Sequence, residues 1–256
     1  MNGRRELYAI YVMWLRQMKR FVRARSRVFA TIVQPLFFLF ILGFGFNIAT
    51  FPGLQGNFLH FFAPGIVAMS ILLSSMFTGV AVLWDRKFGF LQEVLVAPVS
   101  RLSIVIGMTL GGATVALLQG FIIFVISLAL GISIAGPGNL LLAVLIMILL
   151  SFTAVGFGLI MASLMRDFEG FQVIMNLILM PLLFLSSAFF PLVSSSPSWL
   201  KVITFANPLF YMVDGLRGSL TGANNVFPPL FELGLIAVMC VIVMGVGSYL
   251  FNKSEA

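Results

Sequence analysis

The feature that most constrains this chain is a series of apolar stretches, each long enough to cross a lipid bilayer. A helix needs about 20 apolar residues to cross the hydrocarbon layer. Hydrophobic residues make up 61% of the 256 residues and charged residues only 9%, whereas about 25% charged is usual for a soluble domain. Six such stretches predict an all-α polytopic membrane protein rather than a β-barrel, whose strands would alternate over shorter segments. We expect the spans at about 28–48, 61–84, 104–133, 140–164, 171–190 and 230–251.

The segment before the first span, residues 4–27, has a helical repeat with one apolar and one basic face. Trp14, Leu15 and Met18 belong to the apolar side, and Arg16 and Lys19 to the basic side. This pattern is typical of a helix lying in the membrane interface. A disordered basic tail is the alternative, which the regularity of the repeat disfavours. No basic stripe with interleaved aromatic residues lies in a soluble segment, so we expect anionic lipid rather than nucleic acid as a partner.

The orientation follows from the distribution of lysine and arginine. Cytoplasmic loops are enriched in these residues. Placing both termini inside leaves only Lys201 and Arg217 outside, among the 15 basic residues of the chain. We therefore expect cytoplasmic termini in a cell membrane, with segment 85–101 inside and segment 191–227 outside. Three prolines interrupt segment 191–227, which predicts one or two short helices at the outer face.

Segment 85–101 is a short polar stretch between the second and third spans. Phe88, Leu91 and Leu95 recur there at helical spacing, Glu93 lies off that stripe, and Pro98 ends the helix. Two interpretations fit. One is an amphipathic surface helix against which a soluble partner pushes, and the other is an ordinary loop resting on lipid headgroups.

The spans contain few groups that could perform chemistry. Glu232 is the one carboxylate near a span that could couple an ion, and the single histidine, His60, lies in a loop. No GxxxxGK[ST] phosphate-binding loop occurs, and one cysteine, Cys240, excludes an internal disulfide and a cysteine metal cluster. We therefore expect a transport subunit with no catalytic site and no cofactor of its own. An ion-coupled secondary transporter or channel and an intramembrane enzyme are less well supported alternatives.

Four amide side chains within the predicted spans are candidates for lining a translocation path: Gln34, Asn47, Gln119 and Asn176. Interhelical hydrogen bonds are the other interpretation of the same residues. Gly107 and Gly111 form a GxxxG pattern, which we interpret as close packing within the chain rather than as a dimerisation motif.

Two groups of motifs resemble those of a known family. The first comprises Arg86-Lys87-Phe88-Gly89, Glu93-Val94-Leu95 and Ala97-Pro98-Val99-Ser100-Arg101. The second comprises Ser187-Ala188-Phe189-Phe190-Pro191-Leu192, Pro197-x-Trp199-Leu200 and Asn207-Pro208-Leu209-x-Tyr211-x-Val213-Asp214-Gly215-x-Arg217. With these motifs the chain resembles the membrane subunit of ABC-2 type exporters, in particular the drug-efflux branch that includes daunorubicin and nodulation-factor exporters.

The resemblance implies a single ABC-2 transmembrane domain over residues 1–256, paired with a second permease copy that is identical or paralogous. A separate ATPase subunit would bind ATP and Mg and would dock on the N-terminal helix and on residues 88–97. The implied coupling residues are Arg86, Phe88, Leu91, Glu93, Leu95 and Arg101. For the two arginines, contact with lipid headgroups is an equally good interpretation. The implied cargo is a hydrophobic or amphipathic small molecule, with a glycan or lipid-linked saccharide as the alternative.

Overall fold

The computed structural model describes residues 3–46, 54, 57–132, 134, 136–165, 167–192 and 196–254, and in these residues it contains helices and no strands. The predicted all-α fold class is thereby confirmed. In the described part of the chain the elements are α1 (Gly3–Arg23), α2 (Arg25–Gly45), α3 (Phe58–Lys87), α4 (Phe90–Val96), α5 (Arg101–Ala129), α6 (Pro137–Leu164), α7 (Phe168–Phe184), α8 (Ser198–Ala206), α9 (Pro208–Thr221) and α10 (Pro229–Ser254).

Five helices within the described ranges, α2, α3, α5, α6 and α10, are long and apolar enough to cross a membrane. The sixth predicted span corresponds to α7, which has 17 residues. At 1.5 Å per residue such a helix is about 25 Å long, slightly less than a typical hydrocarbon layer. The six-helix membrane domain predicted from the sequence is therefore consistent with the structure, with α7 as its shortest member.

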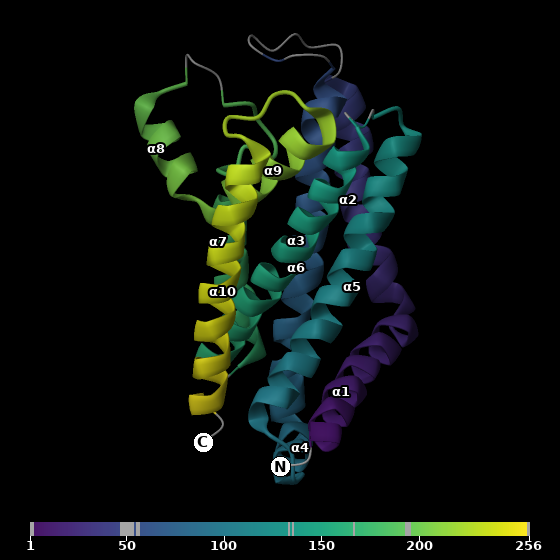
Figure 1. Ribbon diagram of the computed structural model, residues 1–256, viewed down its shortest axis with the longest axis vertical. Helices are drawn as coiled ribbons and strands as arrows, with labels where there is room; N and C mark the ends of the chain where they lie inside the picture. The colour runs from purple at the N-terminus through teal and green to yellow at the C-terminus, as the bar shows by residue number, and fades with distance from the viewer. Residues whose placement is uncertain are drawn as a thin grey trace.

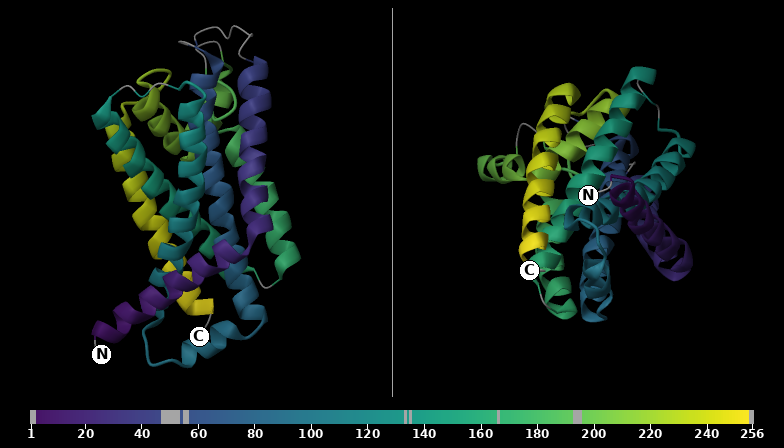
Figure 2. Two further views of the ribbon diagram at one scale, coloured as in Figure 1. Left: turned by 90° about the vertical axis from the view of Figure 1, so that its right-hand side faces the viewer. Right: turned by 60° about the horizontal axis from the view of Figure 1, so that its bottom comes forward.

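Helix α3 forms the centre of the bundle, and α2, α5, α6 and α9 pack around it (Figures 1 and 2). It is buried along most of its length, whereas α10 exposes most of its surface. Small residues permit this central position. A Cβ on Gly79 would lie 2.6 Å from the carbonyl oxygen of Gly158 on α6, so the two backbones touch. Close approach of this kind is a usual source of stability between membrane helices.

Helix α1 ends four residues before the end of the predicted interfacial segment 4–27. It stops at Arg23, Ala24 leaves the helical conformation (φ −87°, ψ 57°), and α2 starts at Arg25. Figure 2 shows α1 crossing the end of the bundle at a steep angle to α2. The chain has to change direction at Ala24 because α1 packs against α5, whereas α2 runs beside α3.

The predicted fifth span, 171–190, is helical only to Phe184. Ser186, Ser187 and Ala188 follow without helical structure, yet all three are buried, and Ser187 has a φ of 59°. Side chains from other parts of the chain satisfy the backbone carbonyls exposed by this ending. Asn207 Nδ2 donates to the Leu182 oxygen over 2.7 Å, and a guanidinium donates to the Ser187 oxygen over 2.6 Å. Irregular backbone is tolerated in a membrane protein where protein buries it.

The guanidinium that donates to the Ser187 oxygen belongs to Arg217 of α9, a residue that is 1% exposed. It also donates to the carbonyl oxygen of Phe61 over 3.1 Å and pairs with Asp214 over 3.4 Å. Asp214 in turn accepts a bond from the backbone N–H of Val226 over 2.7 Å. The sequence places Arg217 in a short segment after the fifth span. The structure makes it a core residue that holds α3, α9 and the segment after α7 together.

The two ends of the bundle differ. Both chain termini lie at the same end as α4, while α8 and α9 lie at the opposite end (Figure 1). Segment 191–227 contains the two short helices predicted from its prolines, α8 and α9. Helix α9 is packed into the bundle, and α8 projects from it with Trp199 and Val202 exposed.

Candidate coupling site

The segment between the second and third spans does form a short surface helix. Helix α3 continues to Lys87, Gly89 adopts a left-handed conformation (φ 76°), and α4 runs from Phe90 to Val96. Ala97 is extended, as expected for a residue before proline. Ser100 then caps α5, its hydroxyl accepting a bond from the backbone N–H of Ser103 over 3.1 Å.

The predicted apolar stripe of this helix is only partly buried. Leu91 is 1% exposed and anchors α4 to the bundle, whereas Phe88 is 69% exposed and stacks on Trp84 with ring centroids 5.2 Å apart. Phe88 lies in the turn before α4 and so does not share its inner face. The side chain of Leu95 lies outside the described part of the structure. Glu93 is exposed, as its place off the stripe predicts.

Helix α1 packs on α5 at the GxxxG pattern. A Cβ on Gly107 would lie 2.7 Å from the Cβ of Met13, and one on Gly111 would lie 2.6 Å from the Cβ of Gln17. The indole of Trp14 donates to the hydroxyl of Thr114 over 3.1 Å on the same contact. The two glycines thus serve packing within the chain, which agrees with the sequence interpretation.

A buried ion pair joins α1 to the end of α3. Arg16 donates two hydrogen bonds of 2.6 Å to the carboxylate of Asp85, which is 4% exposed, and Arg20 approaches the same carboxylate at 3.4 Å. The Arg16 guanidinium also lies 3.7 Å from the centroid of the Phe90 ring on α4. Arg16 of α1 therefore contacts two other helices, α3 and α4, at once. A bidentate pair of this kind fixes orientation as well as distance.

A second polar contact fixes the start of α1. The Glu6 carboxylate accepts bonds from the Ser100 backbone N–H over 3.0 Å and from the Ser100 hydroxyl over 2.8 Å. Hydrogen bonding from Ser103, then from the backbone and side chain of Ser100, lowers the pKa of Glu6 below its usual value. Arg16 thus attaches α1 to the segment before α4, at Asp85, and Glu6 attaches it to the segment after α4, at Ser100.

The two predicted coupling arginines make contacts within the chain. Arg86 donates to the carbonyl oxygens of Ala162, over 3.4 Å, and Met165, over 3.2 Å, at the end of α6. Arg101 donates to the backbone oxygen of Asn252, over 3.3 Å, on α10. A cation at the C-terminal end of a helix is favourable because the last carbonyls lack intrahelical donors. In this structure both arginines join the ends of neighbouring helices.

Between α1 and α4 lies an open groove of about 700 Å³, here called the coupling groove. Its walls are mainly apolar, with arginines along the α1 side and one glutamate on the α4 side. It is lined by Arg4, Arg5, Tyr8, Ala9, Val12, Met13, Arg16, Phe90, Glu93, Val94, Ala97, Pro98, Val99 and Ile104. Of the five predicted coupling residues whose side chains the structure describes, Glu93 alone lines this groove.

The three predicted path-lining residues that the structure describes do not converge. Gln119 is buried and donates to the Thr31 hydroxyl over 2.7 Å, which joins α5 to α2. Gln34 and Asn176 are exposed on α2 and α7. Asn47 lies outside the described residues. For Gln119, the structure matches the interhelical hydrogen bond that the sequence offered as the alternative.

Asp85, Arg16 and Glu6, which join α1 to its neighbouring segments, are not among the coupling residues predicted from the sequence. In the sequence, Arg16 is one of several basic residues in α1, and Asp85 directly follows the predicted second span, 61–84. One signal could have found the pair. Asp85 follows a long apolar run directly, and a carboxylate in that position needs a cationic partner to be buried.

The fold and the site together define a polytopic helical membrane protein with an open groove at the end where its termini lie. The family model for the ABC-2 type transporter matches residues 8–221. The chain therefore belongs to the ABC-2 type transporter family, and the resemblance inferred from its motifs is confirmed.

Named relatives agree with this assignment. The chain is 31% identical over 233 residues to ycf38 of Cyanophora paradoxa, whose name describes a transport permease, covering 87% of this chain and 80% of ycf38. It is 28% identical over 241 residues to the inner membrane transport permease YadH of Escherichia coli strain K12, covering 91% of this chain and 90% of YadH. It is 31% identical over 162 residues to YbhR of the same strain, named as a multidrug ABC transporter permease, covering 62% of this chain and 43% of YbhR.

Proposed function

We propose that this chain is the permease subunit of an ATP-driven exporter that moves a hydrophobic or amphipathic small molecule out of the cytoplasm. A separate subunit hydrolyses ATP with Mg, and two permease copies enclose the path. The termini and α4 face the cytoplasm in this proposal. Family membership supports the pairing with an ATPase subunit, and the name of YbhR supports a drug-like cargo.

The observation that carries the proposal is the coupling groove. It is an open, largely apolar groove rimmed by Arg4, Arg5 and Arg16 on one side and by Glu93 on the other. Such a surface suits a partner segment with an apolar centre and charges of both signs at its rim. Val96, at the exposed end of α4, is 86% exposed and would contact the same partner.

The contacts around the groove supply a route for force. A push on α4 reaches α3 through the short turn at Gly89 and reaches α1 through Phe90 and Arg16. The ion pair between Arg16 and Asp85 would transmit this movement to the end of the central helix α3. Because α3 contacts most of the bundle, movement of its end would be transmitted to the helices that surround it.

The test is Glu93→Arg in the chain reconstituted with its ATPase subunit. Arginine at position 93 would make both rims of the groove positive. The positive charges at the rim of the partner segment would then be repelled, and we expect binding of the ATPase subunit to weaken by about tenfold or more. ATP hydrolysis would no longer respond to cargo, while membrane insertion stays normal. Glu169→Arg is the matched control, since Glu169 is an exposed glutamate at the start of α7 and does not line the groove.

A second variant keeps the test decisive. Ala97→Trp would fill the groove without changing its charge. If Glu93→Arg and Ala97→Trp both bind the ATPase subunit and couple as the wild type does, the groove is not the docking site.

A further inference from the structure

Two adjoining hollows lie at the elbow where α1 turns into α2. The outer one is a basic cleft of about 570 Å³ whose charged walls are Arg16, Lys19, Arg20 and Arg23. The inner one is a polar pocket of about 40 Å³ between α1, α2, α3 and α5. Arg20 and Ala24 line both, so the cleft and the pocket adjoin at these two residues.

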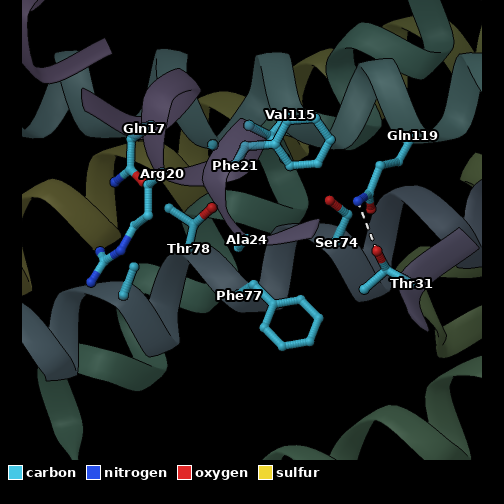
Figure 3. A pocket seen from close by; sticks show the side chains of 12 residues that line it. Gln17, Arg20, Phe21, Ala24, Thr31, Ser74, Phe77, Thr78, Val115 and Gln119 are labelled. Atoms are coloured by element: carbon cyan, nitrogen blue, oxygen red, sulfur yellow. Dashed lines mark hydrogen bonds between the residues drawn. The ribbon is translucent and has the colours of Figure 1, made fainter. Parts of the chain in front are cut away.

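The pocket contains buried polar groups whose hydrogen-bonding capacity is not used. Gln119 and Gln17 are 2% and 7% exposed, and Gln119 Oε1 and Gln17 Nε2 have no hydrogen-bond partner among the described residues. Figure 3 shows Gln119 grouped with Thr31 and Ser74 at one end of the pocket and Gln17 beside Arg20 at the other. Gln119 Oε1 is an acceptor and Gln17 Nε2 a donor, so the pocket has one unused hydrogen-bonding group at each end, and the donor of Gln17 is the one beside Arg20 of the cleft.

Counted over the residues that the structure describes, the cleft carries a net positive charge. Four basic side chains line it, and the carboxylate in contact with them is Asp85, so four positive charges against one negative leave +3. Lys19 and Arg23 are exposed at its mouth, and Val12 and Leu15 supply apolar wall. The cleft also adjoins the start of α2, where an interfacial helix meets a membrane-spanning one. At that depth the abundant anions are lipid phosphates.

We propose that the elbow binds one anionic phospholipid with a hydroxylated headgroup, such as phosphatidylglycerol. The phosphate contacts Lys19, Arg20 and Arg23, a headgroup hydroxyl reaches Gln17 beside Arg20, and the acyl chains follow the apolar surface of α2. The bound lipid would fix the angle between α1 and α2, and with it the position of the α1 wall of the coupling groove. This inference does not depend on the proposed export function, and its test requires no ATPase subunit.

The experiment uses the purified full chain in nanodiscs of phosphatidylcholine with increasing phosphatidylglycerol, and native mass spectrometry counts the retained lipid. We expect one tightly held phosphatidylglycerol per chain. Lys19→Gln/Arg23→Gln should weaken its retention by about tenfold or more, because each basic residue near an anionic surface contributes measurably to binding. Lys87→Gln/Lys253→Gln is the matched control, as it removes two exposed charges at the same end of the bundle but outside the cleft.

A conservative variant separates binding from folding. Lys19→Arg/Arg23→Lys keeps both charges and should retain the lipid, whereas Gln17→Leu should weaken retention of phosphatidylglycerol because the headgroup hydroxyl loses a donor. Equal retention of phosphatidylcholine, or an equal loss of lipid in the Lys87/Lys253 control, would overturn the site. Unchanged retention in Gln17→Leu would overturn the role of the inner pocket. Displacement by soluble glycerol phosphate would identify a phosphate ester, not a lipid, as the ligand.

Discussion

At the residue scale, the structure depends on a few buried charges whose partners lie far away in the sequence. Asp85 is paired with Arg16, 69 positions earlier, and Arg217 donates to the carbonyl of Phe61, 156 positions earlier. A buried charge is costly unless it is paired and hydrogen-bonded. These contacts therefore fix which helices are neighbours more strictly than the apolar packing around them does.

The Arg16–Asp85 pair can be tested by a double-mutant cycle. Arg16→Gln alone should lower the free energy of unfolding by about 1–3 kcal/mol, because it leaves a buried carboxylate with only the longer contact to Arg20. Asp85→Asn alone should also destabilise, and the double variant should cost less than the sum of the two. Circular dichroism during unfolding in detergent measures the stability of the wild type, the two single variants and the double variant. Strict additivity would show that the pair contributes no coupling energy.

At the element scale, α1 is a helix whose position is set by small residues on its neighbour. Gly107 and Gly111 have no side chains that would hold α1 away from α5. The contacts of Glu6 and Arg16 then fix α1 at two points along its length. The amphipathic pattern of α1 accounts for its helical structure, while α5 decides which part of α1 faces protein.

Gly107→Ala should separate α1 from α5. Its new Cβ would lie 2.7 Å from the Met13 Cβ and 2.8 Å from the Ile10 carbonyl oxygen, and overpacking of this kind costs about 1–3 kcal/mol. The matched control is Gly245→Ala in α10, where a Cβ meets nothing within 4 Å. Because alanine has the higher helix propensity, this variant should be as stable as the wild type or more stable. Thermal unfolding in detergent compares the two. Equal stability of both variants would contradict the tight α1–α5 contact.

The Glu6 contact should depend on pH. Since its hydrogen bonds lower the pKa of Glu6 below the usual 4.5, the stabilisation is fully present above that value and is lost as pH falls through the lowered pKa. Trp14 reports on α1 docking through its bond to Thr114. In a Trp84→Phe/Trp199→Phe background, Trp14 fluorescence should show a transition below pH 4.5 that Glu6→Gln removes. An identical transition in Glu6→Gln would assign it to another group.

At the scale of the whole molecule, the bundle has two different ends around one central helix. The end with the termini carries α4 and the coupling groove, and the opposite end carries α8, α9 and the Arg217 contacts. In the proposed function, the ATPase subunit docks at the first of these ends. The central position of α3 supplies a direct connection between the two ends.

The orientation can be measured with single cysteines. Cys240, the one native cysteine, is buried and can be replaced by alanine to give a background without thiols. Val96→Cys on α4 and Trp199→Cys on α8 both replace exposed residues, which are 86% and 63% exposed. In intact cells a membrane-impermeant maleimide should label position 199 and not position 96. The reverse pattern would overturn both the orientation and the proposed docking of a cytosolic ATPase.

The sequence by itself determined the features that depend on neighbours along the chain. Apolar runs located the membrane helices, the helical repeat predicted α1 and α4, and prolines predicted the short helices α8 and α9. These predictions succeed because a helix is made from contacts three and four residues apart. The GxxxG pattern at Gly107 likewise indicated close packing, although the sequence does not say that α1 is the helix that packs there.

Only the tertiary structure decided where α1 ends, where α7 stops, and which charges are buried. The break at Ala24 follows from the different helices that α1 and α2 pack against, and the irregular stretch after Phe184 is stable because Asn207 and Arg217 satisfy its carbonyls. The lining of the coupling groove and the contacts of Arg86 and Arg101 are also set by distant segments. Such contacts join residues far apart in sequence, and local periodicity contains no information about which distant side chain supplies the missing partner.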